Sequence, residues 1–220
     1  MTNEIKFLSD EIISSELNEL ILNSKHKILI CNPWLDPEHH VIKNLIAALN
    51  KKTSVEIITL PPSKEKYRKA LNKLSSNGAK IYFVENLHAK IFVFDFRYLI
   101  IGSTNLNTTS LGRNHEAALY TNKIDVIDNA CEYIDELKKN SQEMEIQEKT
   151  EKIAETKETK EIGFCIQCSI EKEMDIDKPL CMECWKENRH KYKWREVCHK
   201  CGKKAKVSVN RPLCDECYYA

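Results

Sequence analysis

The sequence predicts an α/β fold in which a mixed sheet is flanked by helices, followed by two small cysteine-rich modules. Between Ile5 and about Lys139, segments with helical periodicity alternate with short apolar runs typical of buried strands. Several strand-like runs then follow one another, which indicates a mixed sheet rather than a purely parallel one. Eight of the ten cysteines lie between Cys165 and Cys217, beyond this region. Two parts that are stabilised in different ways are therefore expected.

The alternation of elements can be followed from the start of the chain. Residues 10–24 carry apolar positions at helical spacing, and the following run KILICNPW predicts a buried strand that Pro33 closes. A helix, a strand and a helix come next, then four strands and a last helix. These are expected at 38–50, 55–60, 64–77, 81–85, 88–95, 98–103, 116–122 and 123–139. The third helix ends at Asn77-Gly78, a typical stop signal.

Composition limits the broad class of protein. The chain has 220 residues, a hydrophobic content of 42% and a formal charge of +1, so no overall field favours nucleic acid or a membrane surface. No apolar run approaches the ~18 residues that span a bilayer. The first thirty residues do not resemble a secretion signal. We therefore expect a soluble cytoplasmic protein.

Shifts in composition divide the chain into four parts. Residues 1–140 are expected to form the α/β domain, and 141–162 a charged linker with few apolar residues, either disordered or helical. Residues 163–187 and 196–220 are two copies of one small unit, because every cysteine in the first copy recurs 33 residues later.

The clustered cysteines predict two zinc sites. Each repeat contains two Cys-x-x-Cys pairs separated by twelve residues, and such pairs let two sulfurs converge on one ion from a tight turn. Four thiolates close a tetrahedral shell, so the two zinc ions are expected to be structural. Close pairing in a reducing compartment favours metal over disulfides or an iron–sulfur cluster. The candidate ligands are Cys165, Cys168, Cys181, Cys184, Cys198, Cys201, Cys214 and Cys217. Each repeat resembles a zinc ribbon, and pairing within a repeat is favoured over an interleaved arrangement.

Two further features of the sequence have competing interpretations. Cys31 and Cys131 stand alone and are expected to be small apolar core residues. Residues 186–206 contain nine Lys or Arg against two Glu, with Tyr192 and Trp194 among them. This basic strip fits either a surface that contacts nucleic acid or a solvated surface whose aromatics pack on the modules.

Polar residues stand at unexpected places in the strands between 88 and 103. Residues i and i+2 of a strand face the same side, so His88 and Lys90 point together, as do Ser103 and Asn105. Gly102 permits close approach by a ligand or by another backbone. If the strands are neighbours, an imidazole, an ammonium, a hydroxyl and an amide meet at one edge. That set suits phosphate, since its donors bind phosphoryl oxygens and the imidazole can attack phosphorus.

The pattern H-x-K-x4-D-x6-G-S-x-N, which begins at His88, resembles the signature of the phospholipase D superfamily. The resemblance extends over residues 5 to about 139, and Glu116 falls where this family usually places an acidic residue. The resemblance implies a phospholipase D-like fold and a phosphodiesterase that needs no metal for its chemistry. Asp95, the acidic residue of the motif, is expected to be structural, because strand alternation puts it on the face opposite His88.

The resemblance also implies a role for each motif residue. His88 would attack phosphorus and form a phosphohistidine intermediate, while Glu116 would orient and polarise it. Lys90 and Asn105 would hold the phosphoryl oxygens, with help from Ser103. A second histidine must protonate the leaving oxygen and later activate water.

The single motif predicts a shared site. His39 and His40 lack a lysine two residues later and are expected in a loop, so the second His88 would come from another copy of the chain in a homodimer. Small single-motif members of the family are often nucleases, which makes a DNA or RNA nuclease the expected function. The alternatives are a phospholipase D-type lipid hydrolase or transferase and a weakly catalytic module that binds phosphate or nucleic acid.

Overall fold

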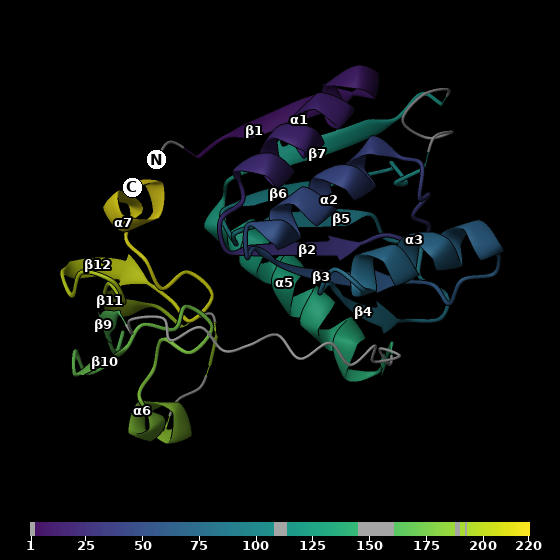
Figure 1. Cartoon of the computed structure of the whole chain (residues 1–220). Coiled ribbons are helices and arrows are strands. Elements are labelled where there is room, and N and C mark those ends of the chain that lie inside the picture. Colours follow the sequence, from purple (N-terminus) through teal and green to yellow (C-terminus); the bar gives the residue numbers. More distant parts are fainter. Residues whose placement is uncertain (1–2, 108–113, 145–160, 188–189, 192) are drawn as a thin grey trace. The chain divides into compact units, whose positions relative to one another are not determined.

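The computed structural model divides the chain into two compact units, Met1–Glu148 and Lys149–Ala220 (Figure 1). The residues that it describes are 3–107, 114–144, 161–187, 190–191 and 193–220. Most of the predicted linker, residues 145–160, lies outside the described residues. None of the helices in the described ranges is long and apolar enough to cross a membrane.

An eight-stranded mixed sheet organises the first unit, in the order β1-β7-β6-β5-β2-β3-β4-β8. β3 runs parallel to β2 and β4, and all other neighbouring strands are antiparallel. The strands are β1 (Ile5–Ser9), β2 (Lys27–Cys31), β3 (Ser54–Thr59), β4 (Lys80–Phe83), β5 (Ile91–Phe94), β6 (Tyr98–Gly102), β7 (Ala117–Thr121) and β8 (Gln142–Glu143). The predicted mixed α/β class is confirmed.

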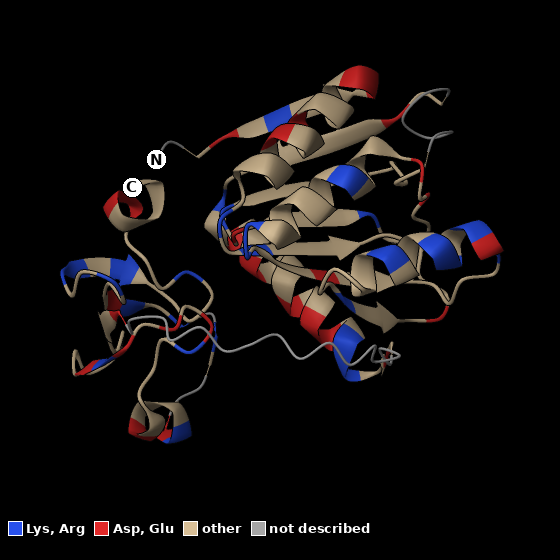
Figure 2. Cartoon of the chain, in the orientation of Figure 1, with Lys and Arg blue, Asp and Glu red and all other residues tan. Residues whose placement is uncertain are grey.

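Helices cover the sheet on both faces. Three of them, α1 (Asp10–Asn23), α2 (His40–Asn50) and α3 (Glu65–Ser75), lie side by side over one face (Figure 1) and share one buried apolar cluster with it. α5 (Ile124–Lys139) contacts β3 and β5, and its buried residues lie outside that cluster. α3 exposes mainly basic residues and α5 mainly acidic ones (Figure 2).

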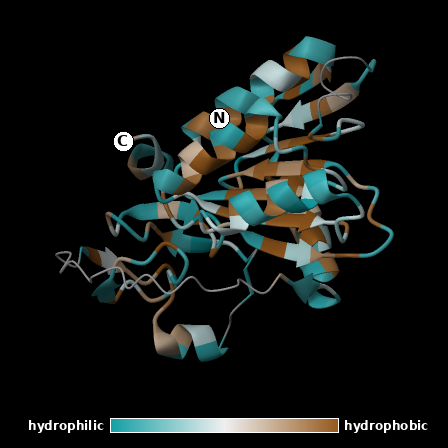
Figure 3. Ribbon diagram, turned by 45° about the vertical axis from the view of Figure 1, so that its right-hand side comes forward, coloured by the Kyte–Doolittle hydropathy of each residue, from teal (hydrophilic) through white to brown (hydrophobic). Residues whose placement is uncertain are grey.

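The central strand β2 is apolar from Ile28 to Cys31 because both of its faces are covered. Ile28 and Ile30 belong to the cluster under the three helices, whereas Leu29 is also buried and points to the other face by strand alternation. A strand covered on both faces needs apolar residues at successive positions (Figure 3). Cys31 and Cys131 are both buried, as expected of core residues.

Several elements differ from the sequence-based expectation. β1 and β8 are additional strands at the two edges of the sheet, and β8 takes up the first part of the predicted linker. The expected strand 88–95 is shorter, because regular pairing begins only at Ile91. His39 and His40 are not loop residues: His39 is the N-cap of α2 and His40 its first residue.

The second unit has the same order of elements twice. β9 (Ile162–Phe164) and β10 (Glu171–Glu173) form an antiparallel pair, followed by α6 (Met182–Glu187). β11 (Arg195–Val197), β12 (Lys204–Val207) and α7 (Asp215–Tyr219) repeat this order, each starting 33 residues after its counterpart. The internal repeat of the sequence is therefore also a repeat of structure.

A buried ion cluster fastens α5 to the sheet. Glu56 of β3 is buried; it pairs with Lys27 Nζ at 2.5 Å and is also paired with Lys138 of α5. Burial raises the pKa of Glu56, but attraction and hydrogen bonds from the two lysines outweigh it, so the pKa lies below its ordinary value. The ionised carboxylate therefore stabilises the fold above the pKa of the unfolded chain, and this stabilisation is lost as pH falls through the folded value.

Replacing Glu56 by Gln should lower the free energy of unfolding by about 3 kcal/mol at pH 7, because two lysines lose their buried partner. The difference from the unsubstituted protein should shrink as the pH falls through the lowered pKa of Glu56, where the carboxylate itself becomes protonated. Urea unfolding of both proteins between pH 3 and pH 7 measures this. A difference that does not change with pH would contradict the electrostatic role.

Candidate active site

Five of the candidate site residues converge on a cavity of about 450 Å³ at the ends of neighbouring strands. His88 and Lys90 precede β5, Ser103 and Asn105 follow β6, and Glu116 precedes β7. Because β6 is antiparallel to both β5 and β7, the start of β5, the end of β6 and the start of β7 lie side by side. The cavity is lined by His88, Ala89, Lys90, Ile91, Ile101, Gly102, Ser103, Asn105, Asn114 and Glu116.

Lys90 is a buried cation in the wall of this cavity, while the side chain of His88 is exposed. Lys90 Nζ donates to the backbone carbonyl of His88 at 2.7 Å, which holds the ammonium beside the segment that carries the imidazole. Burial lowers the pKa of Lys90, and the nearby Glu116 carboxylate opposes that shift. A cation with reduced access to water attracts an anionic group more strongly than an exposed one.

Glu116 and Ser103 form a hydrogen-bonded pair in the cavity. The Ser103 hydroxyl donates to Glu116 Oε2 and accepts from the Ala117 backbone N–H at 3.2 Å. Asn114 Nδ2 donates to Glu116 Oε1 at 3.4 Å. Within the described ranges, no hydrogen bond joins Glu116 to His88. Glu116 therefore orients Ser103 in this structure, and its role toward His88 stays a prediction.

Gly102 is required by the neighbouring strand. A Cβ at this position would lie 2.4 Å from the Ala117 carbonyl oxygen and 2.6 Å from Ala118 Cβ. Close approach of another backbone, one of the two possibilities for this glycine, is observed, and Gly102 also lines the cavity. The same region is tied to α1, because Asp10 Oδ1 accepts from the Glu116 backbone N–H at 3.0 Å.

The position of Asn105 depends on Asn32, which the sequence interpretation missed. Asn32 is fully buried just after β2; its Nδ2 donates to the Thr104 carbonyl at 3.0 Å and its Oδ1 accepts from the Leu106 N–H at 3.3 Å. The backbone on both sides of Asn105 is thus fixed. Asn105 Oδ1 is buried with no hydrogen-bond partner in the described part of the chain. A polar residue directly after an apolar strand was the available signal.

Asp95 lies at the opposite end of β5 from His88. Its carboxylate accepts hydrogen bonds from the backbone N–H groups of Lys25, His26 and Lys27, at 2.7 to 2.9 Å. It thereby joins the turn between β5 and β6 to the start of β2. Asp95 does not line the cavity.

The histidines of α2 are also outside the cavity. His39 is buried, and its Nδ1 accepts from the Val41 N–H at 3.2 Å, which caps the helix. Burial lowers the pKa of His39 to about 4, so the ring is neutral at physiological pH. His40 Nε2 lies 3.1 Å from the hydroxyl of Ser14.

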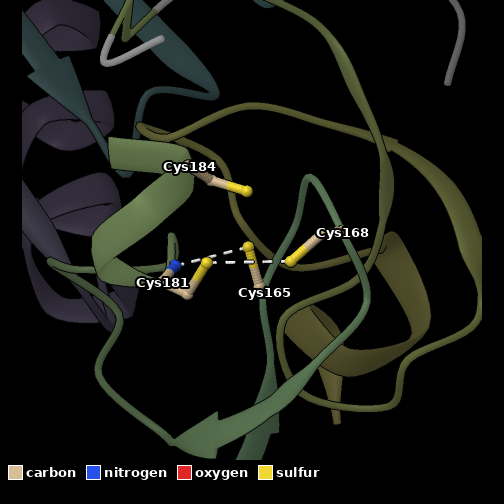
Figure 4. A group of neighbouring side chains, drawn as sticks. All are labelled: Cys165, Cys168, Cys181 and Cys184. Carbon is tan, nitrogen blue, oxygen red and sulfur yellow. Dashed lines mark hydrogen bonds between the residues drawn. The ribbon is translucent and has the colours of Figure 1, made fainter. Parts of the chain in front are cut away.

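In the second unit the eight cysteines gather as two clusters, one in each repeat. The four Sγ atoms within each cluster lie within 4.8 Å of one another, so pairing within a repeat is the arrangement observed. Figure 4 shows the cluster of the first repeat. Backbone N–H groups of Cys181 and Cys214 donate to Cys165 Sγ and Cys198 Sγ, each at 3.3 Å. Burial raises the pKa of these two thiols, but amide hydrogen bonds outweigh it and lower the pKa to about 7. Four convergent sulfurs in each cluster fit a zinc ion.

The basic strip, residues 186–206, is partly paired within the second unit. Trp194 has Lys206 Nζ at 4.2 Å and the Arg211 guanidinium carbon at 5.1 Å from its ring centroid. Lys204 pairs with Glu196 at 3.6 Å and Lys203 with Glu216 at 3.3 Å. Tyr192 lies outside the described residues. Packing of Trp194 on the module is thus observed, and contact with nucleic acid stays a prediction.

Residues 17–138 match the family model described as cardiolipin synthase, PLD-like domain. Among curated proteins, cardiolipin synthase B of Salmonella typhi is 26% identical over 136 residues, which cover 54% of this chain and 33% of the relative. Cardiolipin synthase B of Salmonella typhimurium gives the same values. The chain thus spans about a third of the length of these relatives.

Solved structures give the same fold. Nuc of Salmonella typhimurium, a phospholipase D family member, has a TM-score of 0.61 at 16% identity, over 65% of this chain and 99% of Nuc. NucT of Helicobacter pylori has a TM-score of 0.55 at 14% identity, over 63% and 98%. Phosphatidylserine synthase of Haemophilus influenzae has a TM-score of 0.55 at 16% identity, over 69% and 42%. With more than half of its residues matched by the family model and the fold in agreement, the chain belongs to the PLD-like domain family.

Proposed function

We propose that the chain is a phosphodiesterase that hydrolyses nucleic acid without a catalytic metal. The observation that supports this most is the convergence of His88, Lys90, Ser103 and Asn105 on one cavity of about 450 Å³. The cavity offers one exposed imidazole as a nucleophile beside a buried cation and neutral hydrogen-bonding groups. This combination suits a phosphodiester, whose charge must be stabilised while phosphorus is attacked.

In the proposed reaction the His88 imidazole forms a bond to phosphorus as the bond between phosphorus and the leaving oxygen breaks. A second histidine gives its proton to the leaving oxygen. Water then attacks the phosphohistidine and loses its proton to that second histidine, which regenerates His88. Lys90 and Asn105 hold the phosphoryl oxygens throughout, and Ser103, oriented by Glu116, assists them.

We propose that the second histidine is His88 of another copy of the chain. Of the described residues that line the cavity, His88 is the one histidine. An exposed apolar row leads away from it: Phe7, Leu119 and Ile101 are 70%, 47% and 43% exposed and stand opposite one another on β1, β7 and β6. Ile101 itself lines the cavity. A second copy packed on this row would bury apolar surface and bring two cavities together.

The extent of the structural matches agrees with a catalytic region built of one PLD-like domain. The chain covers 99% of Nuc and 98% of NucT, but only 42% of phosphatidylserine synthase and 33% of cardiolipin synthase B. Single-motif chains of this size are expected to be nucleases. The sequence similarity to cardiolipin synthase B supports the second candidate, a lipid phosphodiesterase or phosphatidyl transferase.

We further propose that each cysteine cluster holds one structural zinc ion, so that residues 163–187 and 196–220 are the two zinc modules and residues 1–140 the catalytic domain. The zinc ions would be separate from the catalytic chemistry. The basic strip would provide an additional contact for the nucleic acid backbone.

Substitution of His88 by Ala should abolish cleavage, with a loss of at least about a thousandfold, because the nucleophile is removed. The full chain is assayed without added divalent metal on single- and double-stranded DNA, on RNA, and on phosphatidylcholine and phosphatidylglycerol vesicles. His40→Ala, which removes an exposed histidine outside the cavity, should retain full activity. Lipid turnover without nucleic acid cleavage would favour the second candidate. Cleavage that survives in His88→Ala would refute the site.

Substitution of Leu119 by Asp should convert a dimer into a monomer and lower activity by at least about a hundredfold, because a charge would be buried between the two copies. Light scattering after size exclusion measures the mass, and circular dichroism checks that the fold is kept. Ile12→Asp, at another exposed apolar position on α1, should leave both properties unchanged. A fully active monomer would rule out the shared site.

A further inference from the structure

We infer that the two cysteine repeats bind zinc as one cooperative unit, because each repeat supplies part of the apolar cover over the cysteines of the other. The inference rests on the proposed zinc sites. It goes beyond them by stating how the two sites depend on each other. The two zinc modules therefore form one cooperative unit rather than two independent zinc ribbons.

The first repeat covers the cysteines of the second. Met174 and Ile176 follow β10 in the first repeat, yet they pack in an apolar cluster made of residues from the second. That cluster contains Cys198, Leu213 and Tyr218 as buried members, together with the partly buried Cys201, Cys214 and Cys217. All four candidate zinc ligands of the second repeat therefore belong to an apolar cluster that includes side chains of the first.

The second repeat covers the cysteines of the first in the same way. Val207 and Val209 occupy the positions that lie 33 residues after Met174 and Ile176. Both are buried, and they pack with three ligands of the first repeat and with its apolar neighbours. The buried members of this cluster from the first repeat are Cys165, Ile166, Leu180 and Cys184, and Cys181 packs against them. The exchange is thus reciprocal: the exchanged segments, residues 174–176 and 207–209, each contribute two side chains to the apolar cluster of the other repeat.

His199 fastens the two repeats together beside a zinc ligand. It follows Cys198 directly, and its backbone carbonyl accepts from the Phe164 N–H at 2.7 Å. Its ring Nδ1–H donates to the Phe164 carbonyl at 2.5 Å, and its Nε2 accepts from the Asp175 N–H at 3.1 Å. Asp175 lies between Met174 and Ile176. The turn that carries Cys198 is therefore bonded both to β9 and to the exchanged segment of the first repeat.

The two repeats are also in close steric contact at Gly163 and Gly202. A Cβ on Gly163 would lie 2.7 Å from the His199 carbonyl oxygen. Gly202 has φ +68°, and a Cβ there would lie 3.1 Å from the ring of Phe164. Glycine is thus required on both sides of the contact, which holds Phe164 and His199 in their hydrogen-bonded positions.

These contacts couple the two metal sites in free energy. A unit of about 25 residues buries too little apolar surface to stay folded alone, and a bound metal commonly supplies the missing stability. Loss of zinc from one repeat would release its exchanged segment and uncover the cysteines of the other. By linkage, zinc at either site must strengthen zinc at the other by the same factor.

Native mass spectrometry of the full chain during a zinc titration tests the inference directly. At half saturation the forms with no zinc and with two zinc ions should dominate, and the one-zinc form should stay a minor species. A dominant one-zinc form at half saturation would overturn the coupling. If no zinc is bound even at saturation, the zinc sites themselves fail, which is a separate result.

A ligand variant tests the coupling from one side. Cys165→Ser combined with Cys168→Ser removes two ligands from the first repeat and leaves all four in the second. The affinity of the second site, measured in competition with a chromophoric chelator, should fall at least about tenfold. Retention of one zinc with the affinity of the unsubstituted chain would overturn the inference.

A packing variant tests the proposed route without touching any ligand. Met174→Ala should weaken zinc binding by about tenfold, because it removes apolar cover from the second cluster. Met182→Ala is the matched control, since Met182 is 70% exposed on α6 and should leave affinity unchanged. Equal affinities in the two variants would show that the exchanged segment does not carry the coupling.

Discussion

The close contact between Gly102 and the start of β7 is the constraint on which the candidate active site depends. Because a side chain at this position would overlap the Ala117 carbonyl, only glycine lets β6 and β7 reach their observed spacing. That spacing allows Ser103 to bond both to Glu116 and to the backbone of β7. Antiparallel pairing of β6 with β5 then brings His88 and Lys90, which precede β5, beside Ser103. A larger residue at 102 would push β6 away from β7 and thereby separate Ser103 from Glu116.

Charged groups in the first unit serve two different ends. Glu56 and Asp95 are buried carboxylates whose oxygens are occupied by lysines or by backbone amides, so they hold elements together. Lys90 is buried beside a cavity and donates to a backbone carbonyl, so its positive charge remains available to an anion. The candidate site thus combines neighbouring elements held by ion pairs and hydrogen bonds with a cation that an anion can approach.

The two units reach stability by different routes. The first buries the central strands of its sheet between helices on both faces, which a domain of its length can do. The second has two short strand pairs and short helices, and its apolar clusters are formed mostly by the cysteines and a few neighbours. Exchange of segments between the repeats enlarges each cluster. Packing in this unit is therefore centred on the two cysteine clusters.

The sequence by itself determined the α/β pattern, the cysteine repeat and the motif residues around the cavity, because these follow from local periodicity and spacing. The length of β5, and not strand alternation, separates Asp95 from His88, because β5 covers only Ile91–Phe94 and the two residues lie beyond its opposite ends. Only the tertiary structure revealed β1, whose Ile5 and Phe7 are exposed and whose partner β7 lies more than a hundred residues away. It also revealed the hydrogen bonds by which Asn32 fixes the backbone around Asn105, the close contact of Gly102 with β7 and the exchange of segments between the repeats. Each of these is a contact between distant segments, and no local pattern encodes which backbone or side chain will arrive there.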